Sequence, residues 1–130
     1  MRVILIILLA LGLFFLSVTS EGADWKLIGK NKDGILIFVD TESIKHISKT
    51  VDRAWVKFSF EKPEPIDLTF LKSQLLYFEN DCSEDKVRIL QGMQYYTDGT
   101  YDDIPSGSWK YIAPDTINEL IHNYLCKSKK

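Results

Sequence analysis

The sequence predicts an α+β fold in which an antiparallel sheet carries one C-terminal helix packed on it. Three observations lead to this prediction. Residues 54–60 alternate largely between apolar and polar side chains, which is the period of a strand with one buried face. The step Asp33-Gly34 separates two short runs of β-forming residues and is typical of a hairpin turn. Residues 116–125 begin with a capping signal and repeat apolar residues at helical spacing.

The first half of the domain supplies three predicted strands. In chain order we expect strands at 25–30 and 35–40, a helical turn at 41–44, a polar loop at 45–50 and a strand at 54–60. Asp40 or Thr41 starts the helical turn, and Trp55 interrupts the alternation of the third strand. The stretch Lys62-Pro63-Glu64-Pro65 is expected to end that strand in a loop, because each proline removes a backbone donor.

The second half supplies two more strands and the helix. We expect strands at 70–78 and 87–97, joined through 79–85, and then a loop rich in Gly, Pro and Asp at 99–108. No segment between consecutive strands has the length and period of a crossover helix, so the sheet is predicted to be antiparallel. Thr116 and Glu119 form a Thr-x-x-Glu capping box at the helix start. The apolar stripe of the helix should lie across the sheet; it consists of Ile117, Leu120, Ile121, Tyr124 and Leu125.

The N-terminus reads as a cleaved secretion signal over residues 1–23. Arg2 precedes an apolar run from Val3 to Leu16, and small residues follow that suit cleavage after Ser20, Gly22 or Ala23. The alternative is an uncleaved membrane anchor, but the run of about 14 residues is short of the roughly 20 that cross a bilayer. We therefore expect an exported protein, periplasmic or extracellular. The sequence has no cysteine before Cys82, so an N-terminal lipoprotein is not expected.

Residues 24–130 have the length of one domain, large enough to bury a single core. The formal net charge is −2, and basic residues are interspersed with carboxylates along the chain. This distribution does not indicate a nucleic-acid partner, which would require basic residues gathered on one face. The basic end of the chain, residues 127–130, is interpreted as a solubilising tail.

Two cysteines in an exported chain predict a structural disulfide. We pair Cys82, in the turn between two strands, with Cys126, at the end of the helix, because this bond would hold the helix against the sheet. An intermolecular bond is the alternative. Neither cysteine stands in a Cys-x-x-Cys motif or beside a basic activator, so redox chemistry is not expected.

No catalytic or metal-binding pattern is present. No serine stands in Gly-x-Ser-x-Gly, so we assign no catalytic residue and expect no enzyme and no cofactor. His46 and His122 are far apart, and His122 is expected to be solvated on the polar side of the helix, so no zinc site is predicted. Asp98, Asp102 and Asp103 lack the spacing of an EF-hand loop and are interpreted as turn residues rather than calcium ligands.

Aromatic residues that flank the long loop, together with one from the strand at 54–60, are the candidate recognition residues. They are Trp55, Tyr95, Tyr96, Tyr101 and Trp109. Exposed aromatics could stack on a sugar or contact a protein, although several should belong to the core. The period of a strand places Tyr95 and Tyr96 on opposite faces, so at least one of them is expected to be visible from outside the core.

The order of several short motifs resembles the surface-adhesin protein E family of Gram-negative bacteria. The motifs are Trp25, Phe38-Val39-Asp40, Ser43-Ile44, Ala54-Trp55, Tyr77-Phe78-Glu79-Asn80-Asp81-Cys82, Tyr95-Tyr96, Trp109, Pro114-Asp115-Thr116 and Cys126. The resemblance covers nearly all of residues 24–130. It implies a curved antiparallel sheet of about six strands with a C-terminal helix tethered by the disulfide. It implies no binding residue at a numbered position.

The resemblance implies an adhesin-like function. The leading hypothesis is an exported, non-enzymatic binding module that acts by protein contact at the cell envelope or outside the cell, with host extracellular-matrix or envelope proteins as partners. The absence of an N-terminal cysteine for lipidation departs from the adhesin. The alternative is a periplasmic small-ligand or envelope-stress domain, with a cavity under the helix lined by Trp55, Tyr95 or Trp109. A monomer and a homodimer both remain open, since an exposed edge strand could pair with a second copy.

Overall fold

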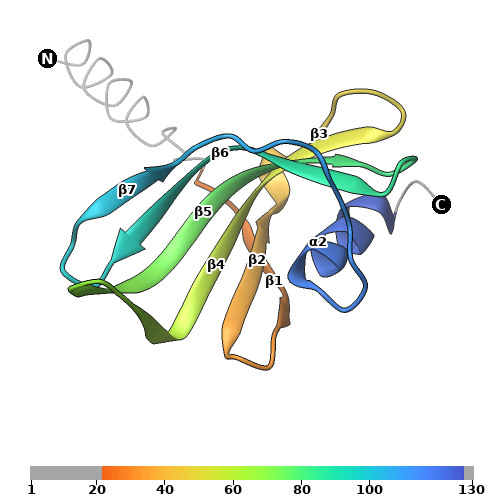
Figure 1. Cartoon of the computed structure of the whole chain (residues 1–130). Helices are drawn as coiled ribbons and strands as arrows, with labels where there is room; N and C mark the ends of the chain where they lie inside the picture. Colours follow the sequence, from red (N-terminus) through yellow and green to blue (C-terminus); the bar gives the residue numbers. More distant parts are fainter. Residues whose placement is uncertain (1–21, 128–130) are drawn as a thin grey trace, which may run out of the picture.

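A strongly curved antiparallel sheet forms the framework of the protein, which we describe from a computed structural model (Figure 1). The structure describes residues 22–127, so residues 1–21 of the predicted signal lie outside it. The strands are β1 (Trp25–Lys30), β2 (Ile35–Asp40), β3 (Lys45–His46), β4 (Val51–Ile66), β5 (Thr69–Asp81), β6 (Lys86–Tyr96), β7 (Tyr101–Ile104) and β8 (Lys110–Tyr111). A 3-10 turn, η2 (Thr41–Ser43), follows β2, and the helix α2 (Ile117–Cys126) ends the fold.

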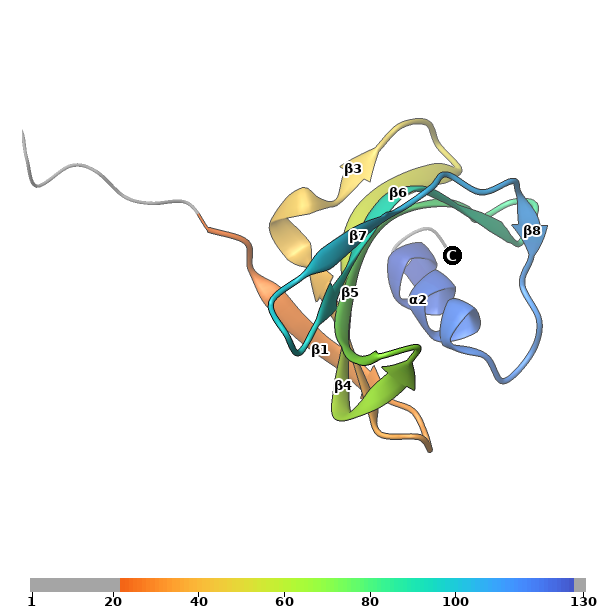
Figure 2. The ribbon, with the colours of Figure 1, turned by 60° about the vertical axis from the view of Figure 1, so that its left-hand side comes forward.

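The strand order is β1-β2-β4-β5-β6-β7, with β3 added beside β4 and β8 beside β6. Every pairing is antiparallel. The sheet bends around α2, which lies within its concave side (Figure 2). The predicted α+β fold, with about six strands in a curved sheet and one helix packed on it, is confirmed.

The turns confirm two local predictions. In the β1–β2 hairpin, Gly34 has a φ of +81°, which suits a residue without a side chain. The side chain of Asn31 organises the same turn by accepting hydrogen bonds from the amides of Asp33 and Ile35. Asp40 starts η2, and its carboxylate accepts a hydrogen bond from the amide of Glu42 at 3.1 Å.

Four segments predicted as loops or connections contain strand, and those predictions were wrong. The 62–65 segment continues β4, because the register shifts between Ser59 and Glu64 and Pro63 falls within this irregular stretch. The 99–108 segment contains β7, which pairs with the edge of β6 after a turn at Gly99. The 45–50 segment contains β3, and 79–81 belong to β5. In each place a neighbouring strand supplies hydrogen bonds that override the local composition.

The core lies between the concave side of the sheet and α2. Its most buried members are Ile37, Val39, Ala54, Val56, Phe78 and Ile121. Leu125 from the predicted helical stripe is also buried, whereas Leu120 is 36% exposed at the edge and covers Gly29. A Cβ atom on Gly29 would lie 2.6 Å from the Cδ2 atom of Leu120, so this glycine permits the close approach of helix and strand.

The disulfide between Cys82 and Cys126 is present, as predicted. It joins the turn after β5 to the last residue of α2. The sulfur of Cys126 lies in the core, where Cys126 is 1% exposed. The bond therefore fixes the C-terminal end of the helix to the sheet while the apolar stripe holds its middle.

The start of α2 allows a first prediction. The Oγ1 atom of Thr116 accepts a hydrogen bond from the amide of Glu119 at 3.2 Å, and the Glu119 carboxylate accepts one from the amide of Asp115. Thr116→Ala should lower the free energy of unfolding by about 1 kcal/mol, because one amide at the helix start loses its acceptor. Urea denaturation measures this change. Thr116→Ser keeps the hydroxyl and is the control; equal losses in both variants would contradict the assignment.

Candidate functional site

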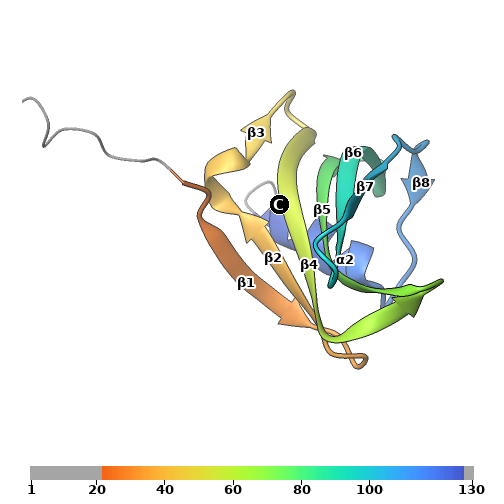
Figure 3. The same cartoon turned by 90° about the vertical axis from the view of Figure 1, so that its left-hand side faces the viewer.

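The convex side of the sheet, which we call the outer face, is the candidate site. Alternation along β4 directs Ala54 and Val56 into the core, so Trp55 and Lys57 point to the opposite side. Figure 3 views the sheet from this side, with α2 behind it. Cross-strand partners form one continuous row over six strands: Leu27, Phe38, Lys57, Leu75, Met93 and Asp103. No described helix covers this row.

Two aromatic pairs lie on the outer face. Trp55 on β4 stacks on Tyr77 on β5, with ring centroids 4.9 Å apart and ring planes inclined by 20°. Tyr95 on β6 faces Tyr101 on β7, with centroids 6.2 Å apart. Three of the predicted recognition residues thus share this face, although they come from three different strands.

A third aromatic group surrounds Lys57. Its Nζ atom lies 4.7 Å from the ring centroid of Trp25 and 5.0 Å from that of Phe38. Such contacts between a cation and aromatic rings hold a long side chain in place. Trp25 and Phe38 were not among the predicted recognition residues, although the alternation in strand 35–40 places Phe38 on the side opposite to Ile37 and Val39.

An ionic cluster extends the outer face toward the turn after β5. Glu79 is almost fully buried and accepts hydrogen bonds from the Nε atoms of Arg53, at 2.5 Å, and Arg88, at 2.8 Å. Trp109 covers Arg88, with the Cζ atom 4.5 Å from the ring centroid, and also contacts Lys86. Two guanidinium groups share one carboxylate, so the cluster presents positive charge beside an aromatic ring.

Tyr96 does not belong to the outer face. It is 8% exposed, pairs with the buried Leu71, and its hydroxyl donates to the Oδ2 atom of Asp102 at 2.7 Å. This hydrogen bond to a carboxylate raises the pKa of the Tyr96 hydroxyl above its ordinary value. Tyr95 and Tyr96 therefore point to opposite faces, as expected, and Tyr96 contributes to packing in the interior.

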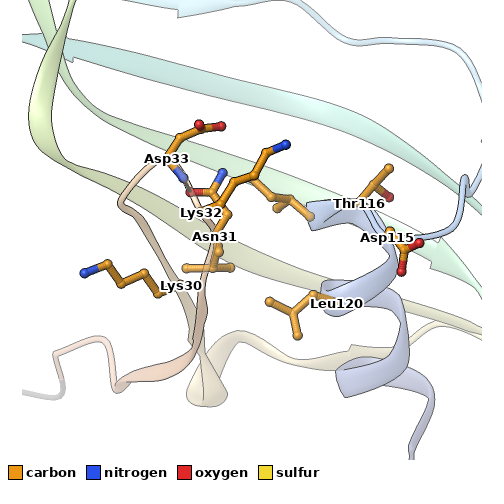
Figure 4. A pocket seen from close by; sticks show the side chains of 9 residues that line it. Lys30, Asn31, Lys32, Asp33, Asp115, Thr116 and Leu120 are labelled. Carbon is orange, nitrogen blue, oxygen red and sulfur yellow. Dashed lines mark hydrogen bonds between the residues drawn. The ribbon is translucent and has the colours of Figure 1, made fainter.

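The structure does not place Trp55 and Tyr95 under the helix, where the alternative function expected them to line a cavity. Both residues lie on the outer face, whereas the side chains beneath α2 are those of the core cluster, such as Ile37, Val56 and Phe78. A surface hollow of about 570 Å³ lies instead between the β1–β2 turn and the start of α2 (Figure 4). Its lining includes Lys30, which forms an ion pair with Glu61 at 2.9 Å, and Leu120.

The predicted exposure of His122 was wrong. His122 is 4% exposed, with its Nδ1 atom 3.2 Å from the Oδ1 atom of Asn80 and its Nε2 atom 3.0 Å from that of Asp85. The curved sheet surrounds a wider arc of α2 than one apolar stripe, so a residue on the polar side of the helix becomes buried. His46 lies elsewhere, with its Nδ1 atom 2.6 Å from the Oδ1 atom of Asp52.

The three aspartates considered as calcium ligands do not converge. Asp98 accepts hydrogen bonds from the hydroxyl and the amide of Thr100, which lower the pKa of its carboxyl group. Asp102 and Asp103 were predicted to be turn residues, but they are successive residues of the strand β7 and point to opposite faces. Within residues 22–127, no group of three or more His, Cys, Asp and Glu side chains is placed to hold a metal ion.

The protein is a small α+β domain. A disulfide-tethered helix covers the concave side of its curved sheet, and the convex side is open to a partner. The chain belongs to the family described as surface-adhesin protein E, which it matches over residues 25–127. A search of curated proteins by sequence found no match. Among the described residues, no helix is both long and apolar enough to cross a bilayer.

Solved structures of Haemophilus influenzae protein E share this fold. Crystal form II is 15% identical, with a TM-score of 0.61, and the match covers 86% of this chain and 94% of that one. A second structure of the same protein is also 15% identical, with a TM-score of 0.59, and the match covers 86% of this chain and 90% of that one. The structure of protein E from a non-typeable strain is again 15% identical, with a TM-score of 0.55, and the match covers 85% of this chain and 80% of that one.

Proposed function

We propose that the chain is an exported, non-enzymatic adhesin-like module that binds other proteins through its outer face. The uncovered outer face carries this proposal. Aromatic and arginine side chains are the residues that contribute most to protein interfaces, and this face combines both. Membership of the surface-adhesin protein E family supports the same function.

The two ends of the outer face are the most accessible to a partner. Leu27 on β1 is 53% exposed and Tyr101 on β7 is 61% exposed. Between them lie the half-buried rings of Phe38, Trp55 and Tyr77. Aromatic and aliphatic side chains gathered on one face are typical of a docking surface rather than of scattered surface residues.

Export is the second part of the proposal. A disulfide persists in oxidising compartments, and Cys82–Cys126 supports a location outside the cytoplasm. The predicted signal at residues 1–23 supports the same location. Residues 24–130 would then form the exported domain, with host extracellular-matrix or envelope proteins as partners.

Protease treatment of intact cells tests the location. Cells producing the untagged full-length chain are treated with protease, while the culture medium and an osmotic-shock fraction are assayed in parallel. We expect loss of the protein from intact cells or its appearance in the medium. Protection until the outer membrane is opened would contradict adhesion and favour the periplasmic alternative.

Substitutions at the ends of the outer face test protein contact. The double variant Leu27→Ser with Tyr101→Ser should weaken binding to immobilised laminin, fibronectin or collagen IV by about tenfold, because it removes exposed apolar anchors. Surface plasmon resonance measures the affinity. Leu68→Ser is the matched control, since Leu68 is fully exposed in the β4–β5 turn, outside the row. Unchanged binding by the double variant, or no binding by the natural chain, would contradict the proposal.

A further inference from the structure

We propose that the outer face contains a binding site for one neutral saccharide ring. The site is a hollow of about 290 Å³ that is lined by Trp55, Gln91, Gly92, Met93, Asp103 and Ile104. These residues come from β4, β6 and β7. The volume lies near the lower end of small-molecule sites and suits one ring.

Trp55 supplies an apolar platform. Tyr77 stacks on one side of the indole, with ring centroids 4.9 Å apart, and Trp55 also lines the hollow, so we infer that a part of the indole not covered by Tyr77 faces it. The C–H bonds on one side of a pyranose ring form a flat apolar surface. An aromatic plane that is held in position can contact this surface without losing further side-chain freedom.

Gln91 and Asp103 supply the polar partners. Both are exposed, and neither side chain forms a hydrogen bond or an ion pair with another residue of the 22–127 segment. The amide of Gln91 can donate and accept, and the carboxylate of Asp103 accepts. Hydroxyl groups around a sugar ring donate and accept as well, so they can bind both groups while the ring lies on Trp55.

The same residues favour a sugar over an organic cation. Recognition of a quaternary ammonium group relies on several aromatic rings around the charge. Only Trp55 among the residues that line this hollow is aromatic, and a cation would leave the amide of Gln91 without a hydroxyl partner. A polypeptide needs a larger surface than one hollow of this size.

This site does not depend on protein contact by the outer face. Protein contact would use the exposed ends of the outer face at Leu27 and Tyr101, neither of which lines the hollow, whereas the sugar needs Trp55, Gln91 and Asp103. Leu27 and Tyr101 lie outside the hollow, and Gln91 lies outside the row, so substitutions at these residues separate the two functions.

Saturation-transfer NMR and isothermal titration calorimetry test the site, with the full-length chain purified from the cells that produce it. The probes are cellotriose, chitotriose and lactose, and choline is the cationic comparison. We expect at least one saccharide to bind. Trp55→Ala and Asp103→Asn should each weaken that binding about tenfold, and Gln91→Ala should weaken it about threefold.

The control variant is Tyr111→Ala, which removes a ring that is 80% exposed and lies outside the hollow. It should bind the saccharide as the natural chain does. Gln91 and Asp103 are exposed, so these two variants should keep the fold even if Trp55→Ala does not. The proposal is overturned if no saccharide binds, if choline alone binds, or if saccharide binding persists in both the Gln91 and the Asp103 variants.

Discussion

Replacing Cys82 and Cys126 together by alanine is expected to lower the free energy of unfolding by about 4 kcal/mol. The bond closes a loop with a sequence separation of 44, and in the chain-entropy model a loop of this length restricts the unfolded chain by about this amount. Small domains have a total stability of roughly 5–15 kcal/mol. The variant should therefore lose a large part of its stability, and α2 should separate from the sheet first.

Urea denaturation of the oxidised natural chain, the reduced natural chain and the double variant measures this effect. The reduced chain is the matched control, because it lacks the bond but keeps both side chains. It should be nearly as unstable as the double variant. A loss below about 1 kcal/mol in both samples would show that packing alone holds the helix and would contradict the chain-entropy argument.

Ile121→Ala is expected to lower the free energy of unfolding by about 3 kcal/mol. Ile121 is fully buried between α2 and the sheet, where it contributes to one core cluster with Val39, Val56 and Phe78. Truncation removes buried apolar surface and leaves a cavity that the curved sheet can fill only in part. Chemical denaturation followed by circular dichroism measures the change.

The neighbouring residue provides a matched control. Leu120→Ala removes a side chain of the same composition from the same turn of α2, but Leu120 is 36% exposed and lies at the edge against Gly29. Leu120→Ala should lower the free energy of unfolding by about 1 kcal/mol, because this substitution removes less buried apolar surface than Ile121→Ala does. Equal losses at Leu120 and Ile121 would mean that the helix is held by general contact and not by its buried stripe.

Much of the fold could be predicted because its signals are local. The Asp33-Gly34 turn, the cap at Thr116 and the alternation of residues 54–60 each depend on a few neighbouring residues. All three are present in the structure. The boundaries were less predictable where a neighbouring strand extends an element, as in β7 and in the second half of β4. In these regions, hydrogen bonds to a strand that is distant in the sequence determine where the element ends.

The candidate site was less accessible to prediction. Trp55, Tyr95 and Tyr101 were identified by their aromatic character, and the structure places them on one face. The structure assigns Tyr96 to the interior and brings Trp109 against Arg88. The pairing of Arg53 and Arg88 with Glu79 had no signal in the sequence, because ordinary charged residues in three strands meet only when the strands are in register.

The sequence by itself determined the class of fold, the pairing of Cys82 with Cys126 and the positions of the principal turns and of the helix. These properties follow from the conformational preferences of a few adjacent residues and from the presence of only two cysteines. The tertiary structure alone decided which face of the sheet α2 covers, and hence that His122 is buried and the outer face is open. It also decided that Trp55, Gln91 and Asp103 border one hollow, because side chains so far apart in the sequence meet only through the register of separate strands.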